Sequence, residues 1–149
     1  MSYDERADLL SAYAAAPPAI RALLRGAETG AVERSPGGED WNVRQVLDHL
    51  AVSAEGMAKR LARIASEDRP DLVPFDDSGS DPMPVDEALT RFETARSQEM
   101  AVLTGADDGG WDRIGIHPAH GEISIRDIVR HMSSHDLEHI GQIGRSLTG

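Results

Sequence analysis

Apolar residues recur along most of the chain every three or four positions, which is the spacing of an amphipathic helix. Four segments follow this pattern, and stretches rich in glycine, proline and acidic residues separate them. The first predicted helix spans residues 4–25, the second 42–64, and the third begins at residue 84 or 85 and ends near residue 104. The fourth begins at residue 124. With little strand-like alternation elsewhere, the pattern predicts an all-α fold of four main helices.

Two proline-containing segments interrupt this pattern. Pro17 and Pro18 lie inside the first predicted helix, where proline lacks the amide hydrogen and clashes with the preceding turn. We therefore expect two short helices that meet at a bend. Residues 66–84 form a polar, proline-rich connection that is long for a compact domain, which is typical of a mobile or functional loop.

Local start signals support the second and fourth helices. Asn42 and Gln45 have the spacing of a capping box. Ser124 can cap the last helix, with the acidic Asp127 in its first turn near the positive end of the helix dipole. Between the third and fourth helices, residues 106–122 predict a loop, with a short extended turn around 114–123.

Length, charge and composition narrow the possible functions. The chain has 149 residues, enough for a single domain with a continuous core, and it contains no cysteine. Disulfides, thiolate metal ligands and a cysteine nucleophile are therefore excluded. A net charge of −11 with scattered Lys and Arg argues against a nucleic-acid partner. Since the N-terminus lacks a signal-peptide pattern and no apolar run reaches about 18 residues, we expect a cytoplasmic protein without a membrane partner.

Histidines give the strongest chemical signal. His131, His135 and His139 recur at every fourth position of the last predicted helix, so they share one face and two imidazoles can converge on one ion. On the helical wheel His139 lies partly inward and His135 at the border of the apolar face. His131 lies farthest out and is the least suitable ligand. His49 flanks the apolar stripe of the second helix, where it can face a cleft between helices. The same spacing also occurs among histidines that only pack or are solvated.

Asp136 falls near the centre of the apolar face of the last helix, where an unpaired carboxylate is costly. Its partner could be a backbone amide, the indole of Trp41 or Trp111, or a histidine that it orients toward a metal. A hydrogen bond between helices without any metal role explains its position equally well.

Further polar residues lie close to the histidines in the sequence. Gln142 is either a polar group at the edge of the site or an exposed one, and Glu138 is a candidate acid–base group. His117 and His120 lie in a loop that contains glycine and proline, where they are either solvated or overhang a site.

Two segments together resemble the DinB-like (YfiT-related) superfamily of candidate metalloenzymes. WNVRQVLDHL matches its tryptophan, helix start and His-Leu pair, and HGEISIRDIVRHMSSHDLEHIGQI matches its glycine turn, final-helix cap and HD-x2-H-x2-Q-I signature. The resemblance covers most of the chain. It implies an up-down-down-up bundle of four helices, often dimeric, with a metal triad at His49, His135 and His139 and a zinc, nickel or similar divalent ion. Some relatives are transferases or isomerases that use mycothiol, bacillithiol or glutathione.

Two functions follow from these observations. The first is a metal-dependent enzyme, a transferase or hydrolase that acts on a small-molecule substrate, because an ion held by three imidazoles keeps an open position. By analogy with the family, transfer of a low-molecular-weight thiol is its leading reaction. The second is a non-catalytic helical module with a structural or vacant metal site. Gly141 and Gly144 in the last helix would let another helix approach closely, including one from the second subunit of a homodimer.

Overall fold

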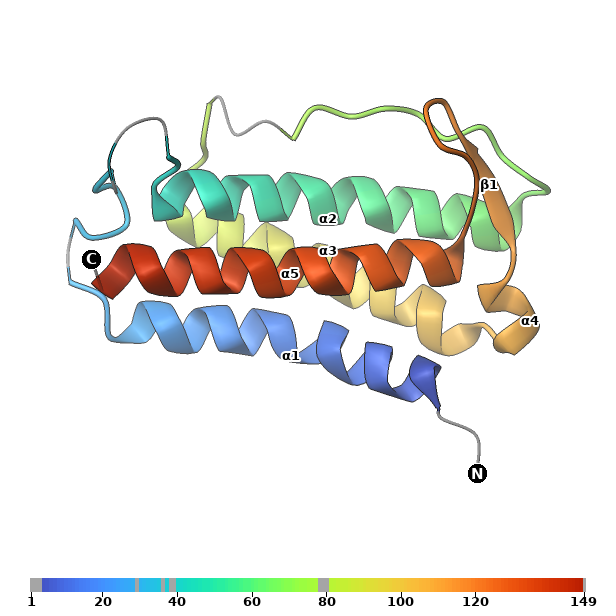
Figure 1. The fold of residues 1–149 in the computed structure, drawn as a ribbon, viewed down its shortest axis with the longest axis horizontal. Helices are drawn as coiled ribbons and strands as arrows, with labels where there is room; N and C mark the ends of the chain where they lie inside the picture. The colour runs from blue at the N-terminus through green and yellow to red at the C-terminus, as the bar shows by residue number, and fades with distance from the viewer. Residues whose placement is uncertain (1–3, 29, 36, 38–39, 78–80, 149) are drawn as a thin grey trace.

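The computed structural model describes residues 4–28, 30–35, 37, 40–77 and 81–148. In chain order its elements are α1 (Glu5–Arg25), α2 (Val43–Ser66), α3 (Val85–Gly105), α4 (Asp108–Trp111), β1 (Ile114–His117), β2 (Gly121–Ser124) and α5 (Ile125–Thr148). The four long helices lie side by side as a bundle, and the short helix and the hairpin lie at one end (Figure 1). The prediction of an all-α fold with four main helices is confirmed.

Polar contacts between α2 and α3 show that these two helices run in the same direction. The Met83 amide, just before α3, donates to Asp48 near the start of α2 at 2.9 Å. Further along both helices, Arg91 of α3 pairs with Glu55 of α2. The helices α1 and α5 run the opposite way (Figure 1). This is the up-down-down-up arrangement. It requires the connection after α2, the segment 67–84, to return along the length of that helix, as Figure 1 shows.

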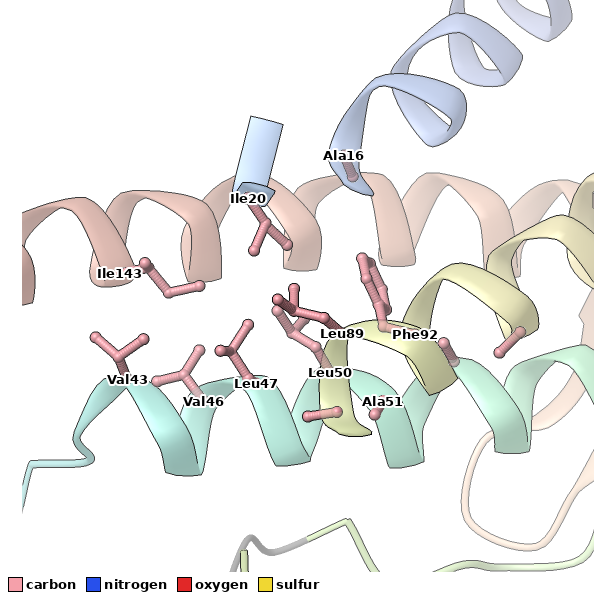
Figure 2. Packing of buried hydrophobic residues seen from close by; sticks show 13 residues of the cluster. Ala16, Ile20, Val43, Val46, Leu47, Leu50, Ala51, Leu89, Phe92 and Ile143 are labelled. Carbon is pink, nitrogen blue, oxygen red and sulfur yellow. The ribbon is translucent and has the colours of Figure 1, made fainter. Parts of the chain in front are cut away.

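Side chains from all four long helices meet in the core. Figure 2 shows Ile20 of α1, Leu47 of α2, Phe92 of α3 and Ile143 of α5 pointing toward one another, and each is almost fully buried. Burying one such side chain contributes about 1.5–3 kcal/mol, so packing rather than helix propensity holds the helices in register. In the described part of the chain no helix combines the length and apolar composition that crossing a bilayer requires.

Both predicted helix starts have the expected caps. The Gln45 amide donates to Asn42 Oδ1 and the Asn42 amide donates to Gln45 Oε1, each at 2.9 Å, which completes a capping box. The Ser124 amide and Asp127 Oδ2, and the Asp127 amide and Ser124 Oγ, form a reciprocal pair at 3.0 Å. These contacts involve residues three apart, which explains why the sequence alone could predict them.

The prediction of two short helices in the first segment is wrong, because α1 continues through Pro17 and Pro18 as one helix. Its axis bends near its middle (Figure 1). Tyr13, Ala16 and Ile20 are buried around the prolines and hold both halves of the helix against the bundle. Their packing outweighs the backbone hydrogen bonds that the prolines remove.

The segment 106–122, expected to be a loop with an extended turn, forms more regular structure. The turn is confirmed as the antiparallel hairpin of β1 and β2, whereas the helix α4 was not predicted. Trp111 of α4 is fully buried, and its indole donates to the Leu103 carbonyl at 3.0 Å. The connection after α2 pairs with β1 through Leu72, whose amide donates to the Ile116 carbonyl at 2.9 Å. Residues 78–80 of that connection lie outside the described residues.

The two glycines of α5 have close neighbours within this chain. A Cβ at Gly144 would lie 4.0 Å from Leu23 Cδ2 of α1, and a Cβ at Gly141 would lie 3.2 Å from Arg145 Nη1. The neighbouring helix that Gly144 faces is therefore α1. A second subunit on this surface stays a prediction.

Candidate metal centre

The side chains of His49, His135 and His139 converge between α2 and α5. The Nε2 atoms of His49 and His135 lie 2.8 Å apart, and those of His139 and His135 lie 3.2 Å apart. One ring nitrogen from each of the three lies within 4.8 Å of the others, and all three side chains are half-buried. The packing of α2 against α5 thus brings together His49 and His135, which are 86 residues apart in sequence.

Hydrogen bonds on the far side of two rings determine which nitrogen carries the hydrogen. His49 Nδ1 lies 2.5 Å from the Asp77 carbonyl oxygen, and His139 Nδ1 lies 2.8 Å from the Gln142 side-chain oxygen. Because these oxygens only accept, each Nδ1 donates, and each Nε2 presents a lone pair. Two lone pairs therefore face His135 Nε2.

This arrangement fits a divalent ion. An ion with bonds of 2.0–2.1 Å to tetrahedrally placed imidazoles separates their nitrogens by about 3.3 Å, close to the spacing found here. Facing lone pairs repel one another, and a cation between them removes that repulsion. Three protein ligands also leave one tetrahedral position open, as in catalytic zinc sites. His135 Nδ1 is buried without a partner among the described residues.

The electrostatic surroundings favour neutral imidazoles. Burial, together with the positive charges that His139 and His49 would carry, lowers the pKa of His135 to about 4. Burial also lowers the pKa of His139, although its hydrogen bond to Gln142 acts in the opposite direction. At neutral pH both rings are uncharged, which is the state that a metal ion requires of a histidine ligand.

Asp136 is buried, as predicted, and of the explanations considered the structure has the hydrogen bond between helices. Arg96 of α3 donates to both of its carboxylate oxygens, from Nη1 at 2.8 Å and from Nη2 at 3.1 Å. The expectation that Asp136 accepts from an indole, a backbone amide or a ligand histidine is wrong, because α3 supplies a charged donor. Asp136 therefore ties α5 to α3 directly beside His135.

Arg96 belongs to a buried polar network. Besides its contact with Asp136, it donates to the Tyr13 carbonyl at 2.9 Å and to Glu99 Oε2 at 3.0 Å. Burial raises the pKa of Glu99 to about 7, despite the opposing charge of Arg96. A sequence signal existed, because Arg96 and Glu99 both fall on the inward side of α3, between Phe92 and Leu103.

The other candidates lie around the three histidines. Gln142 is at the edge of the site, where it contacts His139. Glu138 is exposed and lines a polar cavity of about 500 Å³ together with His139 and Gln142. His131 is exposed, as expected, and its ring centroid lies 6.2 Å from that of His135, so it is a neighbour of the converged group.

The loop histidines lie away from the converged group. His117 and His120 stack on each other with ring centroids 4.5 Å apart. Both line a cavity that His131 also lines. They overhang this neighbouring cavity, and the structure does not bring them to His49, His135 and His139.

Two residues at the site were not predicted. The carbonyl of Asp77 receives the hydrogen bond from His49, and the Asp77 carboxylate accepts a hydrogen bond from Ser53 Oγ at 2.7 Å. Asp77 belongs to the proline-rich connection, where the sequence has no periodicity from which its position could follow. Ser53 is one helical turn after His49 and holds the same loop.

Several known proteins are similar to this chain. It is 22% identical over 138 residues to YuaE of Bacillus subtilis strain 168, an uncharacterised protein, with 80% of this chain and 85% of YuaE covered. It is 27% and 23% identical to OB0782 and OB0413 of Oceanobacillus iheyensis, which are named as candidate metal-dependent hydrolases. These two matches cover 69% and 72% of this chain and 63% and 65% of the relatives, so the chain spans slightly less than two thirds of each.

The fold is also that of a solved structure. YfiT from Bacillus subtilis, described as a candidate metal-dependent hydrolase with an unusual four-helix bundle topology, matches with a TM-score of 0.86 and 19% sequence identity. The match covers 98% of this chain and 87% of YfiT. The sequence pattern of the DinB superfamily matches residues 12–143, which is most of the chain. On this evidence the chain belongs to the DinB superfamily.

Proposed function

We propose that the protein is a metal-dependent hydrolase of a small molecule, with one divalent ion, zinc or nickel, held by His49, His135 and His139. The observation that carries this proposal is the convergence of three Nε2 atoms, two of which present lone pairs because their Nδ1 atoms donate elsewhere. The names of two relatives point to the same class of reaction.

The reaction needs a metal ion with an open coordination position and a cavity through which the substrate can reach that ion. A divalent ion on three neutral imidazoles keeps its positive charge and lowers the pKa of a bound water toward neutrality. Glu138 is exposed in the polar cavity that His139 lines, where its carboxylate can accept a proton during hydrolysis. Trp41, whose ring centroid lies 5.2 Å from that of His49, lines the same cavity.

Thiol transfer, the reaction expected from the resemblance, is the second candidate. A thiol would compete with water for the same open position, and this chain has no cysteine that could replace an external thiol. We place hydrolysis first because the described residues around the three histidines include a carboxylate for proton transfer and no residue that we can assign to a particular thiol.

Metal content tests the site itself. Elemental mass spectrometry on untagged protein should find close to one ion per chain in the wild type, and His49→Ala, His135→Ala and His139→Ala should each lose it while circular dichroism stays helical. His131→Ala is the matched control from the same helix face and should keep the ion. A wild type that binds nothing after reconstitution with zinc, nickel and manganese would overturn the proposal.

Activity assays separate the two reactions. The reconstituted protein should hydrolyse members of a panel of small esters, amides and lactones, lose that activity with a chelator, and regain it with zinc or nickel. Glu138→Gln should lower the maximal rate while retaining the ion. Activity that requires added glutathione, mycothiol or bacillithiol, with no hydrolysis in its absence, would replace hydrolysis by thiol transfer.

A further inference from the structure

A cavity of about 310 Å³ lies at the hairpin end of α2 and α5. Its lining has three apolar side chains, four basic or imidazole side chains and one carboxylate: Met57, Ile123, Ile128, Arg60, His117, His120, His131 and Asp127. This size lies at the lower end of the range for small-molecule sites, and a mainly apolar lining with a few polar groups is typical of them.

The cavity begins beside the three-histidine centre and extends away from it. His131, on its lining, is one turn of α5 before His135, and the two ring centroids lie 6.2 Å apart. On α2, at a rise of 1.5 Å per residue, Arg60 lies about 16 Å along the helix from His49, and Met57 lies about 12 Å from it. A molecule that reaches from Arg60 to the three histidines would therefore span on the order of 16 Å.

Arg60 is a half-buried guanidinium without a carboxylate partner among the described residues. It stacks on the Phe75 ring at 4.7 Å from the centroid, and its Nη2 donates to the Val73 carbonyl at 3.2 Å. Its Nε is buried and has no acceptor in the described part of the chain. Most described arginines of this chain pair with a carboxylate, whereas Arg60 has only the more distant charge of Asp77, so its partial burial is costly. An anionic ligand would offset that cost.

Packing holds Arg60 in this position. Phe75 lies directly on the backbone of Gly56, where an added Cβ would lie 2.6 Å from Phe75 Cδ1, closer than side chains approach. Glycine inside a helix costs about 1 kcal/mol relative to alanine. At Gly56 the missing side chain makes room for Phe75, and Phe75 in turn supports the face of the Arg60 guanidinium.

His117 supplies a second donor to the same cavity. Its Nδ1 accepts hydrogen bonds from the amides of Ala119 at 3.0 Å and His120 at 3.1 Å, so in the neutral ring Nε2 carries the hydrogen. Asp127 also lines the cavity, but one of its oxygens accepts from the Ser124 amide as part of the α5 cap. The cavity thus combines one guanidinium, one neutral N–H donor, an apolar floor and the Asp127 carboxylate, which the cap of α5 already engages.

We propose that this cavity binds the carboxylate end of an elongated small molecule, with its apolar body on Met57 and Ile128 and its reacting end beside His131 and the metal centre. One guanidinium balances a single negative charge, which favours a carboxylate monoanion over a phosphate dianion, and its planar fork can donate to both carboxylate oxygens. The position of the reacting end rests on the proposed hydrolase function. The carboxylate site itself depends only on the cavity.

Calorimetric titration with 4-phenylbutyrate and its uncharged amide, 4-phenylbutyramide, tests this site. The carboxylate should bind the wild type about 10- to 100-fold more tightly than the amide, which is the usual range for a charged hydrogen-bonded contact. Arg60→Gln should weaken carboxylate binding by the same factor and leave amide binding unchanged. Lys59→Gln removes one positive charge from the neighbouring, exposed position on α2 and should leave both affinities unchanged.

Several outcomes would overturn the proposal: equal binding of acid and amide, an equal loss in Lys59→Gln, or tighter binding of phenyl phosphate than of phenylacetate. Arg60→Lys, which keeps the charge, should bind the carboxylate better than Arg60→Gln. If the two bind it equally, the arginine acts only by holding the loop, and the proposal fails. Titration of metal-free His49→Ala should retain carboxylate binding. If the zinc- or nickel-reconstituted wild type binds the carboxylate but hydrolyses no member of the substrate panel, only the hydrolase function is refuted.

Discussion

Replacing Arg96 by methionine would leave the Asp136 carboxylate inside the bundle without its counter-charge. The two side chains are only 3% and 5% exposed, and two hydrogen bonds join them. Methionine has a similar length and no charge, so the substitution removes the contacts with both Asp136 and Glu99 while keeping most of the packing.

The expected loss is large because of this burial. Removing one partner from a buried ion pair costs about 3–5 kcal/mol of the free energy of unfolding. The Tyr13 carbonyl also loses the donor that Arg96 supplied. For a chain of this length each kcal/mol lowers the melting temperature by about 2–4 °C, so Arg96→Met should melt roughly 6–20 °C below the wild type.

Urea unfolding followed by circular dichroism at pH 7, with a chelator present, measures this loss without a contribution from metal binding. Arg21→Met is the matched control, because its pair with Glu93 is 47% and 32% exposed and should contribute less than about 1 kcal/mol. The double variant Arg96→Met/Asp136→Leu should recover at least half of the loss, since an apolar pair often replaces a buried ion pair without penalty.

Two results would refute this reasoning. If Arg96→Met costs no more than the control, the buried carboxylate has another partner or is protonated. If the double variant is as unstable as Arg96→Met, the loss comes from misplaced packing and not from an unpaired charge.

Four further outcomes are expected. Burial raises the pKa of Glu99 to about 7, so between about pH 4.5 and 7 the folded chain holds a proton that the unfolded chain lacks. The free energy of unfolding of the wild type relative to Glu99→Gln should therefore fall by on the order of 3 kcal/mol as the pH rises from 5 to 8, and parallel curves would contradict this. Gly56→Ala should displace Phe75 and raise hydrogen exchange in the connection around it; unchanged protection would count against the packing described. Gln142→Met, which removes the acceptor of His139 Nδ1, should weaken zinc binding about 10- to 100-fold in competition with a chelating dye; an unaltered affinity would show that Gln142 does not orient its neighbour. Zinc at a hundredfold excess over its dissociation constant should stabilise the wild type by about 2.7 kcal/mol and His139→Ala not at all; equal stabilisation of both would place the ion elsewhere.

The parts of the fold that sequence reasoning recovered depend on local rules. Helix spacing located the four long helices, and capping contacts three residues apart located two of their starts. The helical wheel distinguished the exposed His131 from the half-buried His135 and His139 because the apolar stripe of α5 is clear. The pairing of α2 with α5 came from the resemblance, since helix spacing does not say which helices become neighbours.

The parts that were missed depend on contacts distant in sequence. Arg96 reaches Asp136 across 40 positions, and Ser53 reaches Asp77 across 24. No local pattern links such residues, and Asp77 lies in a connection without periodicity. The continuous α1 is a different case. The rule that proline interrupts a helix is sound, but the core packing around Pro17 and Pro18 keeps α1 in one piece.

The parallel course of α2 and α3 has a consequence for how this protein can change over time. At 1.5 Å per residue α2 is about 36 Å long, and an extended chain needs at least about 11 residues to cover that distance. The segment 67–84 therefore cannot be trimmed to a short turn, unlike the links between antiparallel helices, and part of it always lies over the face of α2 that carries His49. Apart from residues with the contacts described above, such as Leu72, Phe75 and Asp77, positions in this connection can vary without disturbing the helices. New ligand preferences can therefore arise by substitution in this connection while the three histidines stay as they are.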